Sequence, residues 1–171
     1  NYPFKENFTH LIGYVSQANQ DDIETTDVIK KNFVPGLKVG KVGLEKSFEK
    51  KLIGSNDIER YEVNAYGRRI SQLEFQKGEK GKNLRLTIDT EVQKLANELL
   101  KDQAGSICVM DIYTGDIIAM QSSPSFDPNL FVFGISKDDW QLIRNDPMKP
   151  LVNKTLQGNY SPGSTIKPIV A

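Results

Sequence analysis

The sequence of 171 residues has one cysteine, one histidine and no long apolar run. One cysteine cannot form an internal disulfide, and one cysteine with one histidine cannot supply the four ligands of a structural zinc site. No apolar stretch approaches the roughly 20 residues that span a bilayer. The residues from Asn1 to Asn7 are largely polar and do not resemble a signal peptide. We therefore expect any membrane anchor to lie outside this chain.

An excess of charge of one sign is also missing, because 22 basic residues balance 22 acidic ones. Residues 1–83 carry 14 basic and 12 acidic residues, a net charge of +2. Residues 84–171 carry 8 basic and 10 acidic residues, a net charge of −2. Neither imbalance indicates a surface for nucleic acid. No pattern of a metal or cofactor site emerges. Cys108 lies in the apolar run from Ile107 to Met110, which favours an inert, buried thiol.

The first half of the chain mixes short predicted strands and helices. The residues from Thr9 to Val15 are typical of a short strand. Leu44, Phe48 and Leu52 recur every fourth residue, which predicts one helix that ends before Gly54. Two extended arms between Tyr61 and Ile70 surround an Ala-Tyr-Gly turn. The charged segment Lys77–Asn83 contains glycine and no apolar residue, so it is interpreted as a linker.

The second half predicts a helix next to a hairpin. Asp89 and Thr90 can cap a helix, and Gln93 would complete a capping box. One face of this helix carries apolar side chains, namely Val92, Leu95, Ala96, Leu99 and Leu100. Two apolar runs, 107–112 and 117–120, flank a turn at 113–116 and predict a hairpin that needs a cover on both faces. The resulting fold class is α+β, and one core is expected to contain Leu95, Leu99, Ile107 and Val109.

The pattern Ser-x-x-Lys occurs twice, at Ser47 with Lys50 and at Ser164 with Lys167. The first pair lies within the predicted amphipathic helix, so it is interpreted as part of a solvated face. The second pair follows Pro162-Gly163, which lets the backbone turn sharply before a helix begins. Ser164 is therefore expected at or near the start of that helix. The alternative is an ordinary Pro-Gly turn followed by a helix.

A serine and a lysine in this setting can form a nucleophile and its base. Free backbone N–H groups at a helix start favour negative charge, and a lysine three residues later lies on the same side. The lysine must be neutral to accept a proton, which burial or a neighbouring cation favours. Pro168 cannot donate to the carbonyl of Ser164, so the first turn is either 3₁₀-like or the very start of the helix. For His10, the single histidine, a structural role in bonding a neighbouring loop is favoured over catalysis.

The segment from Tyr160 to Pro168 resembles the active-site signature of penicillin-binding proteins. Nearly the whole chain is similar, in collinear order, to class B transpeptidases of the penicillin-binding protein 2 type. The similar segments are Tyr2-Pro3 with Thr9–Val15, Gly43–Glu45, Glu62–Asn64 with Gly67-Arg68, Leu86–Asp89 and Thr114–Met120. The most similar ones are Pro124–Phe131 and Asn145–Pro147 with Pro150–Lys154.

This resemblance implies a pedestal domain of the dimerisation type over residues 1–83 and the start of a transpeptidase domain over 84–171. It implies that Ser164 is acylated by the penultimate D-alanine of a peptidoglycan stem peptide and that Lys167 accepts the proton. The amine of a second stem peptide then resolves the acyl-enzyme into a cross-link. Backbone N–H groups, among them that of Ser164, would hold the oxyanion. No metal or cofactor is implied, and substrate-binding residues cannot be named.

The chain departs from the family by lacking its Ser-x-Asn and Lys-Thr/Ser-Gly elements. We therefore expect this chain alone to be inactive and only the full-length parent to react with stem peptides and β-lactams. The resemblance also implies a polymerase and a scaffold of cell elongation as partners, on the periplasmic side of the bacterial inner membrane. Two alternatives remain. One is a non-catalytic interaction module of the elongation machinery. The other, a β-lactam sensor or β-lactamase, ranks last because such proteins do not usually carry the pedestal.

Overall fold

The computed structural model describes residues 1–161 and 163–170, and it confirms the α+β prediction. The chain forms two compact units. The first contains Asn1 and residues 12–86 and 129–134, and the second contains residues 2–11 and 87–128 with the described part of 135–171. Among the described residues, none of the helices is both long and apolar enough to cross a membrane.

The core of the first unit surrounds a small antiparallel pair of strands, β1 (Val15–Gln17) and β2 (Lys38–Gly40). Val39 is fully buried at the centre of β2. Helix α7 (Asn129–Val132) packs on β1, and the ring of Phe131 stacks on Tyr14 with 4.3 Å between centroids. The other elements of this unit are α2 (Gln20–Thr25), α3 (Asp27–Lys31), α4 (Gly43–Ser47), α5 (Glu49–Leu52), β3 (Ile58–Val63) and β4 (Arg69–Gln76).

The predicted single helix from Leu44 to Leu52 is wrong, because the chain forms two short helices, α4 and α5, that meet at Phe48. The Phe48 backbone leaves helical geometry, with φ −110° and ψ 16°. The Glu49 carboxylate accepts a hydrogen bond from the backbone N–H of Gly40 in β2. Burial raises the pKa of this carboxyl above its ordinary value. A bond to a neighbouring strand thus accompanies the break that the helical periodicity did not predict.

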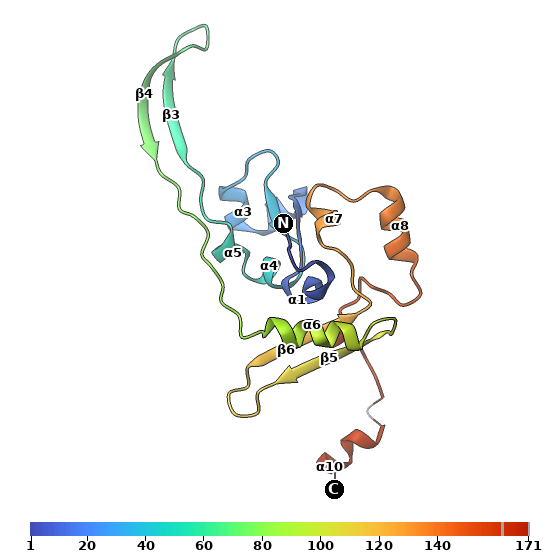
Figure 1. The fold of residues 1–171 in the computed structure, drawn as a ribbon. Helices are drawn as coiled ribbons and strands as arrows, with labels where there is room; N and C mark the ends of the chain where they lie inside the picture. The colour runs from blue at the N-terminus through green and yellow to red at the C-terminus, as the bar shows by residue number, and fades with distance from the viewer. Residues whose placement is uncertain (162, 171) are drawn as a thin grey trace. The chain divides into compact units, whose positions relative to one another are not determined.

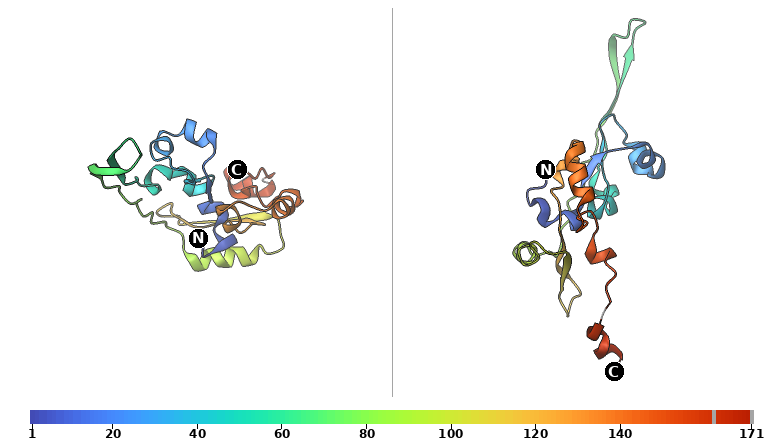
Figure 2. Two further views of the ribbon diagram at one scale, coloured as in Figure 1. Left: turned by 90° about the horizontal axis from the view of Figure 1, so that it is seen from above. Right: turned by 90° about the vertical axis from the view of Figure 1, so that its right-hand side faces the viewer.

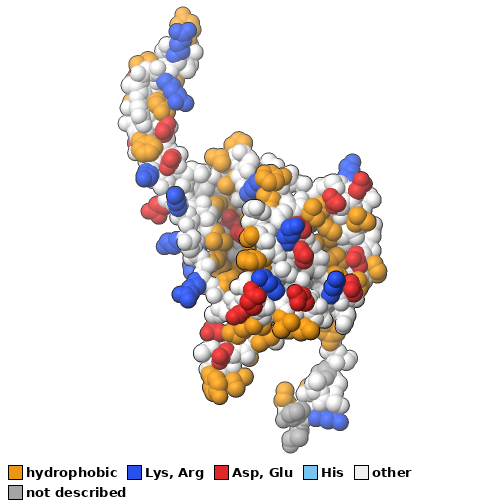
Figure 3. All heavy atoms as spheres, viewed as in Figure 1, with side chains coloured by type: hydrophobic (Ala, Val, Ile, Leu, Met, Phe, Trp, Pro, Cys, Tyr) orange, Lys and Arg blue, Asp and Glu red, His pale blue; other side chains and the backbone are white. Residues whose placement is uncertain are grey.

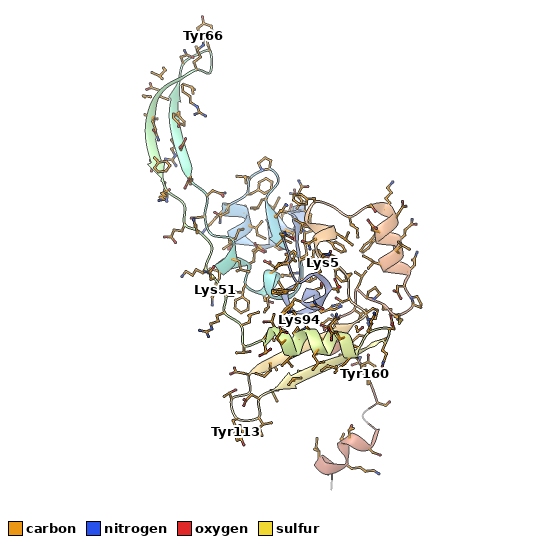
Figure 4. All side chains as sticks on the ribbon, viewed as in Figure 1. Lys5, Lys51, Tyr66, Lys94, Tyr113 and Tyr160 are labelled. Carbon is orange, nitrogen blue, oxygen red and sulfur yellow. The ribbon has the colours of Figure 1, made fainter. Side chains whose placement is uncertain are left out.

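The predicted extended arms form the antiparallel hairpin of β3 and β4, a long ribbon in Figure 1. Its turn is closed by the Gly67 N–H, which donates to the Asn64 carbonyl at 2.9 Å, and Tyr66 lies at the tip (Figure 4). Hydrophobic side chains remain in contact with solvent along this ribbon (Figure 3). Leu73 and Phe75, for example, are 67% and 52% exposed. The hairpin therefore offers apolar surface that nothing in the described residues covers.

The segment interpreted as a linker is held along its length. The Ser55 N–H donates to the Glu79 carbonyl at 2.8 Å, and the Lys82 N–H donates to the Lys51 carbonyl at 2.7 Å. The Gly78 N–H donates to the Asp57 carboxylate at 2.7 Å. These bonds fix residues 77–82 beside residues 51–57, so this segment is an ordered part of the first unit.

The second unit contains the predicted hairpin, formed by β5 (Gly105–Met110) and β6 (Ile117–Ser123), with Ile107 opposite Gln121. The Asp111 carboxylate accepts the N–H groups of Tyr113 and Thr114 and so shapes the turn, where Figure 4 labels Tyr113. The other elements are η1 (Lys5–Asn7), α1 (Thr9–Ile12), which leads toward the first unit, α6 (Thr90–Leu99), α8 (Lys137–Asn145), α9 (Lys154–Gln157), η2 (Gly163–Ile166) and α10 (Lys167–Val170).

Helix α6 lies along the hairpin, as Figure 1 and the left view of Figure 2 show, and packs on β6. Asp89 caps the helix as predicted, because its carboxylate accepts the N–H groups of Glu91 and Val92 at 2.8 and 3.0 Å. Gln93 does not complete a capping box. Its carboxamide is fully buried and bonds both the N–H and the carbonyl of Met120, at 2.8 and 3.0 Å. Gln93 therefore pairs both backbone groups of Met120 at the edge of β6, as a neighbouring strand would.

The predicted core of leucines and hairpin residues is wrong. Because Gln93 and Ala96 face the hairpin, Leu95 and Leu99 on another face of the helix are 52% and 63% exposed. Val109 is 37% exposed, and Cys108 is also exposed, contrary to the interpretation as a buried thiol. A buried amide thus determined the orientation of α6, whereas the apolar periodicity pointed to the opposite result.

The predicted strand from Thr9 to Val15 is also wrong. Residues 9–12 form α1, and only Val15 belongs to a strand, β1. The Thr9 hydroxyl donates to the carbonyl of Phe126 at 2.7 Å, and Thr9 is 1% exposed. A partner 117 residues away in the sequence holds the start of this helix, so the local pattern could not reveal it.

Candidate active site

The second Ser-x-x-Lys pair lies where a 3₁₀ turn passes into a helix. Ser164 belongs to η2, and Lys167 is the first residue of α10, so the 3₁₀-like turn is the one of the two expected alternatives that the chain adopts. Gly163 begins the turn with φ +54°, in the left-handed region. Pro162, on which the predicted Pro-Gly turn also depends, lies outside the described residues. Lys167 follows this turn directly, three residues after Ser164.

Ser164 and Lys167 are both exposed, as are their described neighbours from Gly163 to Ile166. An exposed pair has the residue types of a nucleophile and a base but not the water-excluded surroundings that acyl transfer requires. The described residues therefore leave this serine and lysine open to solvent.

The first Ser-x-x-Lys pair has a different setting. Ser47 ends α4 and Lys50 lies in α5, so the break at Phe48 separates them. Both residues are exposed. This placement agrees with the interpretation of a solvated face.

The segment that precedes Ser164 is anchored by α9. Asn153 caps this helix, since its side-chain oxygen accepts the N–H groups of Thr155 and Leu156 at 3.2 and 3.3 Å. Lys154 is 9% exposed, and its amine donates to the Lys149 carbonyl at 3.0 Å. Burial lowers the pKa of this amine below its ordinary value of 10.5.

Two hydroxyl groups that sequence reasoning did not single out bind α9 to β6. The Ser122 hydroxyl accepts the Lys154 N–H at 2.9 Å, and the Thr155 hydroxyl donates to the Gln121 carbonyl at 3.1 Å. A serine in a strand and a threonine in a short helix form no recognisable motif. Only the three-dimensional contact reveals them.

His10 lies in α1 and has a structural setting. Its ring meets Phe126 edge-on at 5.8 Å, and its backbone carbonyl accepts a hydrogen bond from the Asn153 side chain at 2.9 Å. Among the described residues, its Nε2 is buried without a hydrogen-bond partner. Burial lowers the pKa of the imidazole below its ordinary value of 6.5, and the Lys154 charge acts in the same direction. These contacts support the structural interpretation.

We expect the stability of the protein to fall as the pH is lowered through 6.5. The unfolded state binds a proton on His10 near that pH, whereas the folded state resists protonation until a lower pH, so acid favours unfolding. Urea unfolding at pH 7.5 and 5.5 measures this loss, and the variant His10→Gln should show a smaller one. Equal losses of unfolding free energy in the wild type and in His10→Gln would contradict the assignment of this pH dependence to His10. The same variant of a full-length parent should keep the transpeptidation that the resemblance implies.

Comparison with known families gives two matches in chain order. The family model described as "Penicillin-binding Protein dimerisation domain" matches residues 1–86, and that described as "Penicillin binding protein transpeptidase domain" matches residues 105–171. The peptidoglycan D,D-transpeptidase MrdA of Escherichia coli K12 is 42% identical over 99% of this chain and 27% of its own length. Penicillin-binding protein 3 of Bacillus subtilis is 35% identical over 99% of the chain and 24% of its own length.

Solved structures agree with these matches. A complex between penicillin-binding protein 2 (PBP2) and MreC from Helicobacter pylori superposes with a TM-score of 0.86 at 33% identity, over 98% of this chain and 31% of that chain. Pseudomonas aeruginosa PBP2 in complex with WCK 5153 superposes with a TM-score of 0.82 at 35% identity, over 99% of this chain and 33% of that chain. This chain spans about a quarter of the length of the curated relatives. It belongs to the peptidoglycan D,D-transpeptidases of the class B PBP2 (MrdA) type, with a dimerisation domain followed by part of a transpeptidase domain.

Proposed function

We propose that the full-length protein containing this chain cross-links peptidoglycan during cell elongation and that Ser164 and Lys167 perform its acyl transfer. The observation that carries this proposal is the placement of Ser164 on a 3₁₀ turn and of Lys167 just after that turn, at the start of α10, within the part matched by the transpeptidase model. In this role, residues 1–83 are the pedestal domain and residues 84–171 begin the catalytic domain.

The reaction proceeds in two steps. The Ser164 oxygen attacks the carbonyl carbon of the penultimate D-alanine of one stem peptide, while Lys167 takes the hydroxyl proton and the terminal D-alanine leaves with a proton. The amine of a second stem peptide then attacks the acyl-enzyme, which forms the cross-link and restores the serine hydroxyl. Backbone N–H groups stabilise the oxyanion in both steps, one of them that of Ser164.

The remaining walls of the site come from residues outside this chain. The family's Ser-x-Asn and Lys-Thr/Ser-Gly elements do not occur in the sequence. Exposed apolar side chains on α6 and β5, such as Leu99 and Met110 at 63% and 56%, support a further cover in the full-length protein. The chain alone is therefore inactive in this account.

The proposed partners and location extend what the resemblance implies, and one similar structure supports a partner. The similar PBP2 of H. pylori is known in a complex with MreC, which supports a scaffold partner of that kind, and a polymerase of the elongation machinery is the second partner that we propose. Exposed apolar residues on the pedestal hairpin, such as Leu73, are suited to a protein contact. The full-length protein would act on the periplasmic side of the inner membrane, held by an anchor outside this chain.

A peptide assay tests the proposed function. The full-length protein is incubated with a synthetic stem pentapeptide that ends in D-Ala-D-Ala and with an acceptor amine. We expect release of D-alanine and formation of the cross-linked product, both blocked by prior treatment with a β-lactam. The absence of both products from a folded protein would leave the non-catalytic interaction module as the better account.

A further inference from the structure

The end of β6 is polar although it is buried. Gln121 and Ser122 are 2% and 0% exposed. Burying such groups costs free energy unless they are hydrogen-bonded, and here they are. The Gln121 side chain bonds Gln93 at 2.8 Å and Asn97 at 2.7 Å on α6, while its carbonyl accepts the Thr155 hydroxyl on α9. The strand end thus links two helices.

Helix α9 depends on these polar contacts for its position. It has a single turn, too short to be stable by itself. Its one large apolar residue, Leu156, is 72% exposed, and the residue that it buries is Lys154. The Ser122 hydroxyl accepts a hydrogen bond from the Lys154 N–H at 2.9 Å and donates one to the Val152 carbonyl at 3.3 Å. It therefore binds the chain on both sides of Asn153.

The direction in which the chain leaves α9 is also restricted. The Gly158 N–H donates to the Lys154 carbonyl at 3.1 Å. A Cβ atom at position 158 would lie 2.4 Å from that same carbonyl oxygen and 2.5 Å from the ring of Tyr160. Ser164 follows six residues after this glycine. The chain that carries the nucleophile therefore starts from a point that Lys154 and its partners on β6 determine.

We propose that Ser122 and Thr155 are positioning residues for acylation. Their hydroxyl groups hold α9 against β6 and so set the place from which the segment bearing Ser164 departs. The inference rests on the proposed function, because it concerns the rate at which Ser164 is acylated. Neither hydroxyl needs to touch the substrate.

The test measures acylation of the full-length protein by a fluorescent penicillin, with the concentration dependence resolved into a non-covalent dissociation constant and a first-order acylation rate. Thr155→Val and Ser122→Ala should each lower the acylation rate about tenfold to a hundredfold, because small displacements of reacting groups have effects of that size. The dissociation constant should change less than about twofold, since the pocket walls that bind penicillin are unaltered. Thr155→Ser keeps the hydroxyl and should restore the rate.

Thr87→Val is the matched control. The Thr87 hydroxyl donates to the Ile117 carbonyl at 2.7 Å, at the end of β6 opposite to Gln121 and Ser122. This variant should acylate at the wild-type rate. Removing the Ser122 hydroxyl leaves the buried Lys154 N–H without its acceptor, so Ser122→Ala is the more damaging change. If that variant fails to fold, the milder Thr155→Val variant still decides the test.

Three outcomes decide the inference. Wild-type acylation rates in folded Thr155→Val would overturn it. An equal loss in Thr87→Val would overturn it too, because a general loosening of β6 would then be the cause. A wild-type protein that no penicillin acylates would instead refute the proposed function, and the inference with it.

Discussion

Ser164→Ala in the full-length protein should abolish covalent labelling by a fluorescent penicillin. The acyl bond forms on the hydroxyl oxygen, and alanine lacks it. Lys167→Ala should leave the nucleophile in place and slow labelling about a hundredfold to ten-thousandfold, the usual range for removal of a general base. The melting temperature of each variant, measured alongside, shows whether it remains folded. Gel fluorescence after timed incubation measures the labelling rate.

The second Ser-x-x-Lys pair supplies the matched control. Ser47→Ala and Lys50→Ala change the same residue types at the same spacing, on an exposed part of the first unit. Both variants should label at the wild-type rate. Labelling that survives Ser164→Ala but is lost in Ser47→Ala would transfer the nucleophile to the other pair and contradict the proposed site.

Gly13→Ala should destabilise the first unit by more than about 3 kcal/mol, the largest stability effect that we expect of one methyl group in this chain. Gly13 has φ +84°, which costs an alanine roughly 1–2 kcal/mol by itself. In addition, its Cβ would lie 1.9 Å from the carbonyl oxygen of Val42, so the backbone would have to move. Urea unfolding of the purified protein measures the change in free energy.

Gly36→Ala separates the two contributions. Gly36 has nearly the same φ, +85°, but a Cβ there would meet nothing within 4 Å. This variant should lose only the roughly 1–2 kcal/mol of the backbone conformation. Equal losses in the two variants would show that residues 13 and 42 do not approach each other as closely as the structure has them.

Features set by nearby residues could be predicted from the sequence. The cap at Asp89 and the hairpin turn after Asp111 each depend on residues within a few positions, and Pro168 limited the first turn at Ser164 to two alternatives, of which the chain adopts the 3₁₀ turn. A proline lacks a backbone N–H to donate, and a carboxylate can accept hydrogen bonds from N–H groups a few residues away. Both effects are therefore visible in a short stretch of sequence. The candidate nucleophile and base could be named for the same reason.

Features set by distant partners could not be predicted. Gln93 in α6 bonds Met120, and this bond turns Leu95 and Leu99 away from the hairpin. Thr9 bonds Phe126, and residues expected to form a strand become a helix. Ser122 and Thr155 belong to no motif, so their link between β6 and α9 is visible only in the fold.

The central claim is that this chain carries the nucleophile while other residues complete its pocket. Intact-mass measurement after incubation with the same fluorescent penicillin tests both halves, with this 171-residue chain and the full-length protein treated in parallel. The full-length protein should gain one adduct, which peptide mapping places on Ser164. The chain alone should gain none, because loss of even one oxyanion donor slows acyl transfer about a hundredfold to a thousandfold. A stoichiometric adduct on Ser164 of the chain alone, or an adduct of the full-length protein at another residue, would contradict the account.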